Sequence, residues 1–206
     1  MYSGACAAHV FKRIVIPPVV VIVAPNHTGR SRHPGGAATW DRGAFETPVG
    51  QLTVADEFLS RLEEATPLVA HDPAAHSFEH SVEVELPFLA YLAPETTIAP
   101  LVLAWDDWTR CRELATALAS TVSAWPHEVL LLASSDMTHF ESARAAAGKD
   151  RGALEAIERL DGEGLLSYCD REHVSMCGRA PSAVVLEASR LLGATSAEVV
   201  DYRHSG

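Results

Sequence analysis

The sequence lacks cysteines paired at CxxC or another zinc-ribbon spacing, clustered basic residues and a long uninterrupted apolar run. Its most apolar stretch, IVIPPVVVIVA at residues 14–24, carries Pro17 and Pro18 in its middle. A helix that crosses a bilayer needs about 20 consecutive apolar residues, so this stretch is too short. These absences argue against a zinc ribbon, a basic nucleic-acid surface and a membrane-spanning helix.

Acidic residues outnumber basic ones, and the formal net charge is −11. Such a chain repels phosphate backbones and anionic lipid headgroups. We therefore expect a small molecule or a protein as partner, and neither nucleic acid nor a membrane. No secretory signal precedes the four cysteines, which predicts a reducing, cytoplasmic setting without structural disulfides.

With 206 residues, 48% of them hydrophobic, the chain is large enough to bury a core as one domain. Continuous β-branched and apolar runs alternate with amphipathic stretches. The predicted strands are 19–24, 97–103, 128–133 and 196–202. The predicted helices are 56–65, 106–123, 144–160, 163–171 and one within 177–193. This alternation predicts an α/β domain with a largely parallel sheet covered on both faces.

Two loops that follow predicted strands each carry a histidine. Asn26 and His27 follow the first strand, and Asp136 and His139 follow the strand at 128–133. Ligands of open α/β sheets bind beyond the carboxyl ends of the strands. Two imidazoles delivered there could meet on one metal ion, with Asn26 and Asp136 as polar neighbours that orient them. The alternative is that each histidine is an exposed loop residue.

Cys177 immediately precedes a predicted helix. A helix N-terminus favours a thiolate, which would make Cys177 a nucleophile or a metal ligand. The alternative is a small buried apolar side chain, which is what we expect of the other three cysteines.

Residues 76–80, HSFEH, match the HxxEH signature of inverted zinc proteases. On a helix, His76 and His80 would share a face and Glu79 would be the general base. Nearby prolines leave little room for that helix, and the apolar pattern that follows alternates. Two alternatives to the protease remain. The segment is a solvated acidic stretch, or His80 and Glu83 face the same cleft as His27 and His139.

Six segments occur in the same order as in the Memo-like family, which prokaryotes call AmmeMemoRadiSam system protein B. They are APNHTG, ETPVG, AHSFEHSVEVELPFL, ASSDMTHF, CGRAP and the terminal YRHSG. The opening YSGACAAHVF is also similar to that family. The resemblance covers essentially the whole chain, and it assigns Glu79 and His80 to a family motif rather than to a protease helix.

The resemblance implies a fold similar to the class III extradiol dioxygenases, a three-layer α/β/α sandwich with a largely parallel or mixed sheet. It implies an iron or copper ion held by His27, His139 and Cys177. It also implies catalytic roles for His139, Cys177, His80 and Asp136, and places Asn26 and Glu83 beside the cofactor.

The sequence departs from the family pattern at both ends. The family usually carries a HAGY-like segment just before YSG, and it continues past the final SG into a further strand. We therefore expect residues 1–206 to be a single Memo-like domain that lacks its N-terminal histidine segment and its C-terminal strand. His9 lies within a predicted helix and does not obviously replace the missing ligand, so metal should bind more weakly.

Three functions follow from these observations. The first is a metal-dependent oxidoreductase with dioxygenase-like or other redox chemistry. The second is a non-catalytic assembly component that binds radical-SAM and AMMECR1-like proteins. The third is the HxxEH zinc protease.

Overall fold

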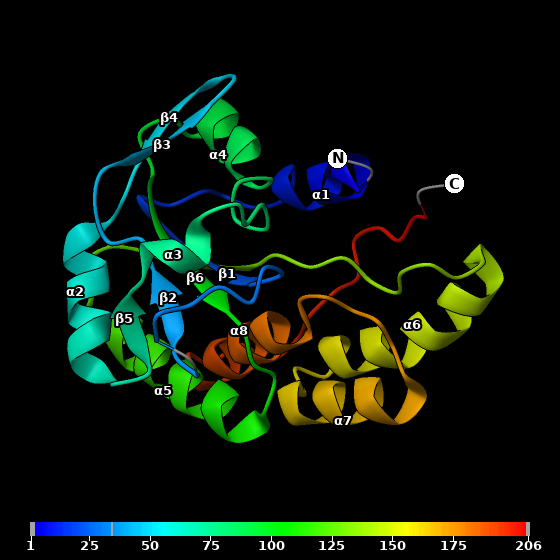
Figure 1. Cartoon of the computed structure of the whole chain (residues 1–206). Helices are drawn as coiled ribbons and strands as arrows, with labels where there is room; N and C mark the ends of the chain where they lie inside the picture. The colour runs from blue at the N-terminus through cyan, green and yellow to red at the C-terminus, as the bar shows by residue number, and fades with distance from the viewer. Residues whose placement is uncertain (1–2, 34, 205–206) are drawn as a thin grey trace.

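A mixed five-stranded sheet in the order β5-β2-β6-β1-β7 forms the centre of the fold (Figure 1). The computed structural model describes residues 3–33 and 35–204. The central strand β1 pairs in parallel with β6 on one side and β7 on the other. In this sheet β2 pairs in parallel with β5 and antiparallel with β6. The strands are β1 (Val19–Pro25), β2 (Ala37–Thr39), β5 (Val69–His71), β6 (Thr97–Leu103) and β7 (Val129–Ala133).

Helices cover both faces of this sheet. Val19, Val21 and Val23 of β1 face one apolar core, and Val20 and Ile22 face the other. This alternation of a fully buried strand produces the three layers of an α/β/α sandwich. The first face is covered by α2 (Asp56–Ala65), α5 (Trp108–Ala124) and α8 (Arg179–Leu191). The second is covered by α1 (Gly4–Phe11), α3 (Pro73–His76), α4 (Leu86–Leu92) and the hairpin of β3 (Ala44–Thr47) and β4 (Gly50–Thr53).

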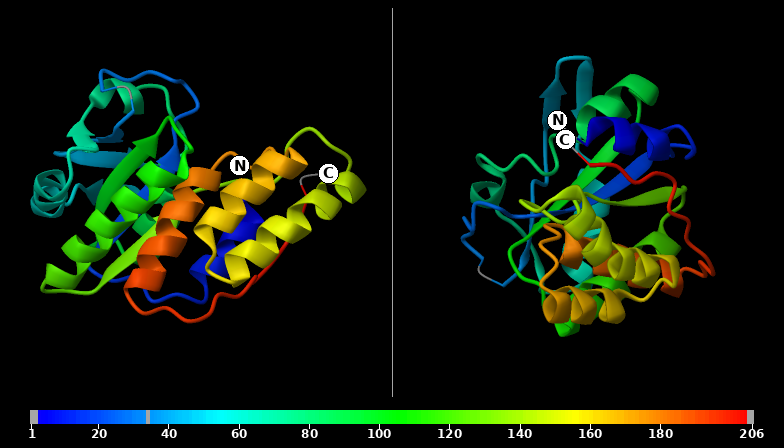
Figure 2. Two further views of the ribbon diagram at one scale, coloured as in Figure 1. Left: turned by 90° about the horizontal axis from the view of Figure 1, so that it is seen from below. Right: turned by 90° about the vertical axis from the view of Figure 1, so that its right-hand side faces the viewer.

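Two further helices, α6 (Ala143–Glu158) and α7 (Gly162–Glu172), lie side by side next to α8 (Figure 2). They form a smaller apolar cluster of their own, to which Leu186 of α8 contributes. The loop that follows β7 leads directly into α6. Helix α6 therefore lies beside the region beyond the carboxyl end of β7, and its residue Leu154 faces that region.

Side-chain caps explain why several helices begin where the sequence predicts. The carboxylates of Asp107 and Asp161 and the hydroxyl of Ser142 each accept a hydrogen bond from the backbone N–H of the third residue of the helix that follows, α5, α7 and α6 respectively. Gly193, with φ of 97°, follows α8 in the left-handed conformation that glycine adopts most easily.

The predicted strand at 196–202 is wrong. This segment runs without strand pairing alongside α1, as the red chain near the N-terminus shows in Figure 1. Side chains hold it instead: Arg13 contacts Glu198, the Cys6 thiol donates to the Asp201 carbonyl, and the Tyr202 hydroxyl donates to Asp150. Anchoring by side chains from α1 and α6 replaces the backbone ladder that the alternating apolar pattern suggested.

Within residues 3–33 and 35–204, no helix has the length and apolar character needed to cross a membrane.

Candidate functional site

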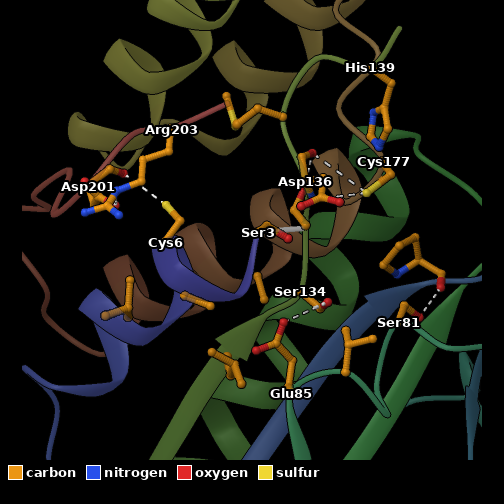
Figure 3. A pocket seen from close by; sticks show the side chains of 18 of the residues that line it. Ser3, Cys6, Ser81, Glu85, Ser134, Asp136, His139, Cys177, Asp201 and Arg203 are labelled. Carbon is orange, nitrogen blue, oxygen red and sulfur yellow. Dashed lines mark hydrogen bonds and ion pairs between the residues drawn. The ribbon is translucent and has the colours of Figure 1, made fainter. Parts of the chain in front are cut away.

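A cavity of about 670 Å³ lies beyond the carboxyl ends of β1 and β7 (Figure 3). Its wall is made by α1, the loops after β1 and β7, the turns at 80–85, Cys177 and the C-terminal segment. Five of the seven predicted site residues line it: His27, His80, Asp136, His139 and Cys177. The parallel pairing of β1 with β7 brings the two histidine-bearing loops together, as the pattern of strands followed by polar loops predicts.

Glu79 holds His27 in place. The carboxylate is only 3% exposed and accepts hydrogen bonds from Nδ1 of His27 at 2.9 Å and from the backbone N–H of His27. The backbone N–H groups of His80 and Ser81 donate to the same carboxylate. Burial alone would raise the pKa of Glu79, but these hydrogen bonds outweigh it and lower the pKa to about 2.

An ionised Glu79 can only accept, so the proton of neutral His27 must lie on Nδ1. The other ring nitrogen, Nε2, then keeps its lone pair for a metal ion or a proton. Hydrogen bonding of the far nitrogen to a carboxylate is the usual way in which proteins orient a metal-binding histidine. Because four donors already engage the Glu79 oxygens, its role here is to position His27.

His80 lies beside His27 and is largely exposed. The two rings stack with centroids 4.9 Å apart and an interplanar angle of 17°. Among the residues that the structure describes, His27, Glu79 and His80 form a group whose potential ligand atoms all lie within 4.8 Å of one another. The potential ligand atoms of His80, His27 and Glu79 therefore lie closer together than those of His27, His139 and Cys177, the set expected from the resemblance.

His139 is oriented in the same way as His27, but by a backbone group. Its Nδ1 lies 2.8 Å from the carbonyl oxygen of Ser175, and its backbone N–H donates to the Ser175 hydroxyl. A carbonyl only accepts, so Nδ1 donates and Nε2 keeps its lone pair. The neighbouring Thr138 donates through both its N–H and its hydroxyl to the buried carboxylate of Asp150 in α6, which fixes the loop.

Cys177 and Asp136 meet where α8 approaches the loop after β7. The Cys177 sulfur accepts a hydrogen bond from the backbone N–H of Asp136 at 3.2 Å. Burial raises the pKa of the Cys177 thiol, and the hydrogen bond from Asp136 only partly offsets this effect. We expected the helix N-terminus to favour the thiolate. Partial burial outweighs that effect, because Cys177 lies two residues before the first residue of α8.

Close packing at this point depends on Gly178. A Cβ at residue 178 would lie 2.3 Å from the backbone oxygen of Ser134 and 2.5 Å from the Cβ of Ser135. The Gly178 N–H donates to the Ser135 hydroxyl at 3.0 Å. The missing side chain therefore lets Cys177 reach the loop after β7.

The other two predicted site residues lie outside the cavity wall. Asn26 turns toward its own loop, where its Nδ2 donates to the Arg30 carbonyl and its Oδ1 accepts from Thr28 and Gly29. It shapes the loop that presents His27. Glu83 is exposed and is not among the residues that line the cavity.

The protease interpretation of residues 76–80 is wrong. Helix α3 ends at His76, and Phe78 has a φ of 66°, which interrupts any continuation of the helix. The His76 ring is buried, with Nε2 donating to the Ala38 carbonyl at 3.0 Å. His76 therefore supports β2 and does not pair with His80 on a zinc ion. The alternative prediction, a solvated acidic segment, is also wrong for Glu79, which is buried.

Glu85 and Cys6 are among the cavity residues to which the sequence assigns no role. Glu85 belongs to the segment for which a solvated acidic stretch was one of the expectations. The only available signal was its position among the apolar residues Val82, Val84 and Leu86.

The family model for Memo-like proteins matches residues 1–206. The chain is 36% identical to a MEMO1 family protein of Methanopyrus kandleri over its whole length, covering 73% of that relative. It is 36% identical to a MEMO1 family protein of Aquifex aeolicus, again over its whole length and over 75% of the relative. A MEMO1 family protein of Sulfolobus acidocaldarius is 34% identical over 94% of this chain and 68% of its own length.

Proposed function

Because the chain belongs to the Memo-like protein family, we propose that its cavity binds an iron or copper ion and supports redox or oxygenase-type chemistry. The observation that carries this proposal is the pair of oriented imidazoles. His27 and His139 are each held through Nδ1, by Glu79 and by the Ser175 carbonyl, and both line one cavity with the Cys177 thiol. Imidazole and thiolate ligands suit both metals.

The chemistry of the donors suits such an ion. His27, His139 and Cys177 would hold it, with His80 as a fourth donor beside His27. The ligand atoms of His27 and His80 already lie within 4.8 Å of one another, whereas His139 and Cys177 would have to move closer to complete the site. An iron or copper ion would supply one-electron redox chemistry and open positions for a substrate and dioxygen. The cavity has room for a small molecule, and Asp136 adds a negative charge to its wall, which favours a cation.

The thiol of Cys177 imposes a pH dependence on this site. Its raised pKa means that the metal-free protein holds the proton, so metal binding must release it. Metal affinity should therefore rise with pH. Glu79 supports His27 at the same time, because its charge stabilises the ring orientation that leaves Nε2 free.

Metal analysis of the purified protein tests the proposal. We expect the wild-type protein to contain iron or copper, and expect His27→Ala and Cys177→Ala to lose most of it. His127→Ala is the matched control, because His127 is exposed and precedes β7 at the end of the strand opposite the cavity. Equal, near-zero metal in the wild-type protein and both site variants would rule the metal site out.

A second candidate function is a non-catalytic assembly component that binds radical-SAM and AMMECR1-like proteins. Two exposed phenylalanines favour it. Phe140 is fully exposed directly after His139, and Phe78 is 85% exposed directly before Glu79. Both have positive φ, which a bulky side chain rarely adopts. Exposed aromatic side chains are typical of interaction surfaces.

Co-purification tests the second function. The wild-type chain should retain recombinant radical-SAM and AMMECR1-like proteins from the same organism, and Phe78→Ser with Phe140→Ser should not. Metal content should stay unchanged in this double variant. Equal retention by the wild-type and variant proteins, or none by either, would exclude these phenylalanines as a docking surface.

A further inference from the structure

Glu85 is a partly buried carboxyl group that faces the cavity and has little to bind. Its Oε1 accepts one long hydrogen bond, from the Ser134 hydroxyl at 3.4 Å (Figure 3). In the described part of the chain, no lysine, arginine or histidine forms a salt bridge with Glu85. Glu85 directly precedes helix α4, but its side chain makes no capping hydrogen bond to that helix. An acceptor group buried without a strong donor is costly, so the site favours a ligand that supplies one.

The surroundings of Glu85 are acidic. Asp136 is close enough to oppose ionisation of Glu85. The one guanidinium in the cavity wall, that of Arg203, is engaged with Asp201 and His9. The other titratable groups of the wall are Cys6, His27, His80, His139, Cys177 and Tyr202. Within the described residues, therefore, no unengaged lysine or arginine neutralises the two carboxyl groups.

The cavity wall also has an apolar part. Helix α1 contributes Val10 and Phe11, and the strand end and the turn contribute Leu132 and Val84. Figure 3 shows Glu85 and Ser134 on one side of the cavity, and Cys177 and His139 on the other. A cavity of about 670 Å³ is far larger than a single ion needs and is in the range of pockets that bind small organic molecules.

We propose that the Glu85 side of the cavity binds a primary amine carried on an apolar body, with the ammonium group hydrogen-bonded to the Glu85 carboxylate and the Ser134 hydroxyl. The apolar body lies against α1 and Leu132. A neutral alcohol of the same shape lacks the charge that Glu85 and Asp136 attract. A carboxylate ligand would face repulsion from both. This site is separate from the proposed metal ligands and does not depend on a bound ion.

The protonation of Glu85 sets how such binding varies with pH. Burial raises the pKa of Glu85 to about 7, with Asp136 adding to the effect and the Ser134 hydrogen bond opposing it. The group is mostly protonated at pH 6 and mostly ionised at pH 8. An ammonium group binds the ionised form of Glu85, and the apparent affinity is proportional to the fraction of Glu85 that is ionised. The affinity should therefore rise about tenfold from pH 6 to pH 8.

Calorimetric titration of chelator-treated protein with benzylamine and benzyl alcohol tests the proposal. We expect the wild-type protein to bind benzylamine more tightly than benzyl alcohol, and about tenfold more tightly at pH 8 than at pH 6. Glu85→Gln should weaken benzylamine binding about ten- to hundredfold at pH 8 and flatten its pH dependence, which assigns the titration to Glu85 rather than to an imidazole of the wall. Benzyl alcohol should bind the variant and the wild type alike.

Glu83→Gln is the matched control, because it makes the same change on an exposed side chain outside the cavity wall, and it should bind benzylamine as the wild type does. Equal affinity of the wild type for the amine and the alcohol would overturn the proposal, even if Glu85→Gln does not fold. Unchanged benzylamine binding by folded Glu85→Gln would overturn it as well. Because metal is removed beforehand, this outcome is independent of whether His27 and Cys177 bind an ion.

Discussion

Nδ1 of His27 lies 2.9 Å from Oε1 of Glu79, although 52 positions separate the two residues in sequence. The contact links the loop after β1 to the turn that follows α3. It fixes the ring of His27 and determines which nitrogen remains available in the cavity. The imidazole of His139 is fixed in the same way by a carbonyl, so both histidines present the same ring atom.

We expect Glu79→Gln to lower the free energy of unfolding by about 2–4 kcal/mol. The carboxylate accepts hydrogen bonds from four donors, and the amide group of glutamine would turn its N–H₂ toward some of them. Urea unfolding measures the loss. The exposed Glu83→Gln should stay within about 0.5 kcal/mol of the wild type, and equal stability of the two variants would contradict the anchoring role of Glu79.

Gly178→Ala should destabilise the protein by about 1–3 kcal/mol, because the added methyl group would overlap the Ser134 carbonyl. Gly148→Ala makes the same change within α6, where nothing lies within 4 Å of the added carbon. That variant should gain up to about 1 kcal/mol from helix propensity. In thermal unfolding, the unfolding temperature should fall for Gly178→Ala and rise for Gly148→Ala. Similar shifts for the two variants would contradict the close approach of α8 to the loop after β7.

Stability should fall as pH rises from about 4.5 to 7 through the Glu85 contribution. The pKa of Glu85 is about 7 in the folded protein and near 4.5 in the unfolded chain, so the folded state binds more protons within this window. The contribution is fully present below pH 4.5 and is lost by pH 7, a difference of up to about 3 kcal/mol. Urea unfolding between pH 5 and pH 8 should show this slope in Glu83→Gln but not in Glu85→Gln.

The hydroxyl of Tyr202 should lose its proton at a higher pH than that of an ordinary tyrosine. Burial raises its pKa to about 12, together with the hydrogen bond that its hydroxyl donates to Asp150 at 2.7 Å. Asp150→Asn removes the negative charge and should bring the pKa of Tyr202 back toward 10. Ultraviolet difference titration against Tyr202→Phe isolates this one phenol. An unchanged midpoint in Asp150→Asn would show that Asp150 does not anchor the C-terminal segment.

The long elements of the fold were predictable because their patterns are strong. The β-branched run at 19–24 and the amphipathic stretch at 56–65 became β1 and α2 nearly residue for residue. The three-residue strands β2 and β5 were not predictable, because β2 depends on its pairing with β6, and β5 on its pairing with β2, rather than on a local pattern. The segment 196–202 alternates like a strand, but contacts with α1 and α6 determine its path.

The site was predictable where it depends on topology. Parallel strands end together, so the loops carrying His27 and His139 had to lie near one another. Burial of individual carboxyl groups was not predictable. Glu79 and Glu85 belong to one acidic segment, yet one is anchored by four donors and the other faces a cavity with a single weak partner.

The central position of β1 also determines when the cavity can form during protein synthesis. Val19 pairs with Thr97 and with Val129, and Cys177 comes later still. Contacts between residues so far apart in the chain form slowly and only after both partners exist. A nascent chain on the ribosome therefore has no pocket until residues well beyond 177 have left the exit tunnel, and any ligand or ion must arrive after translation of this segment has finished.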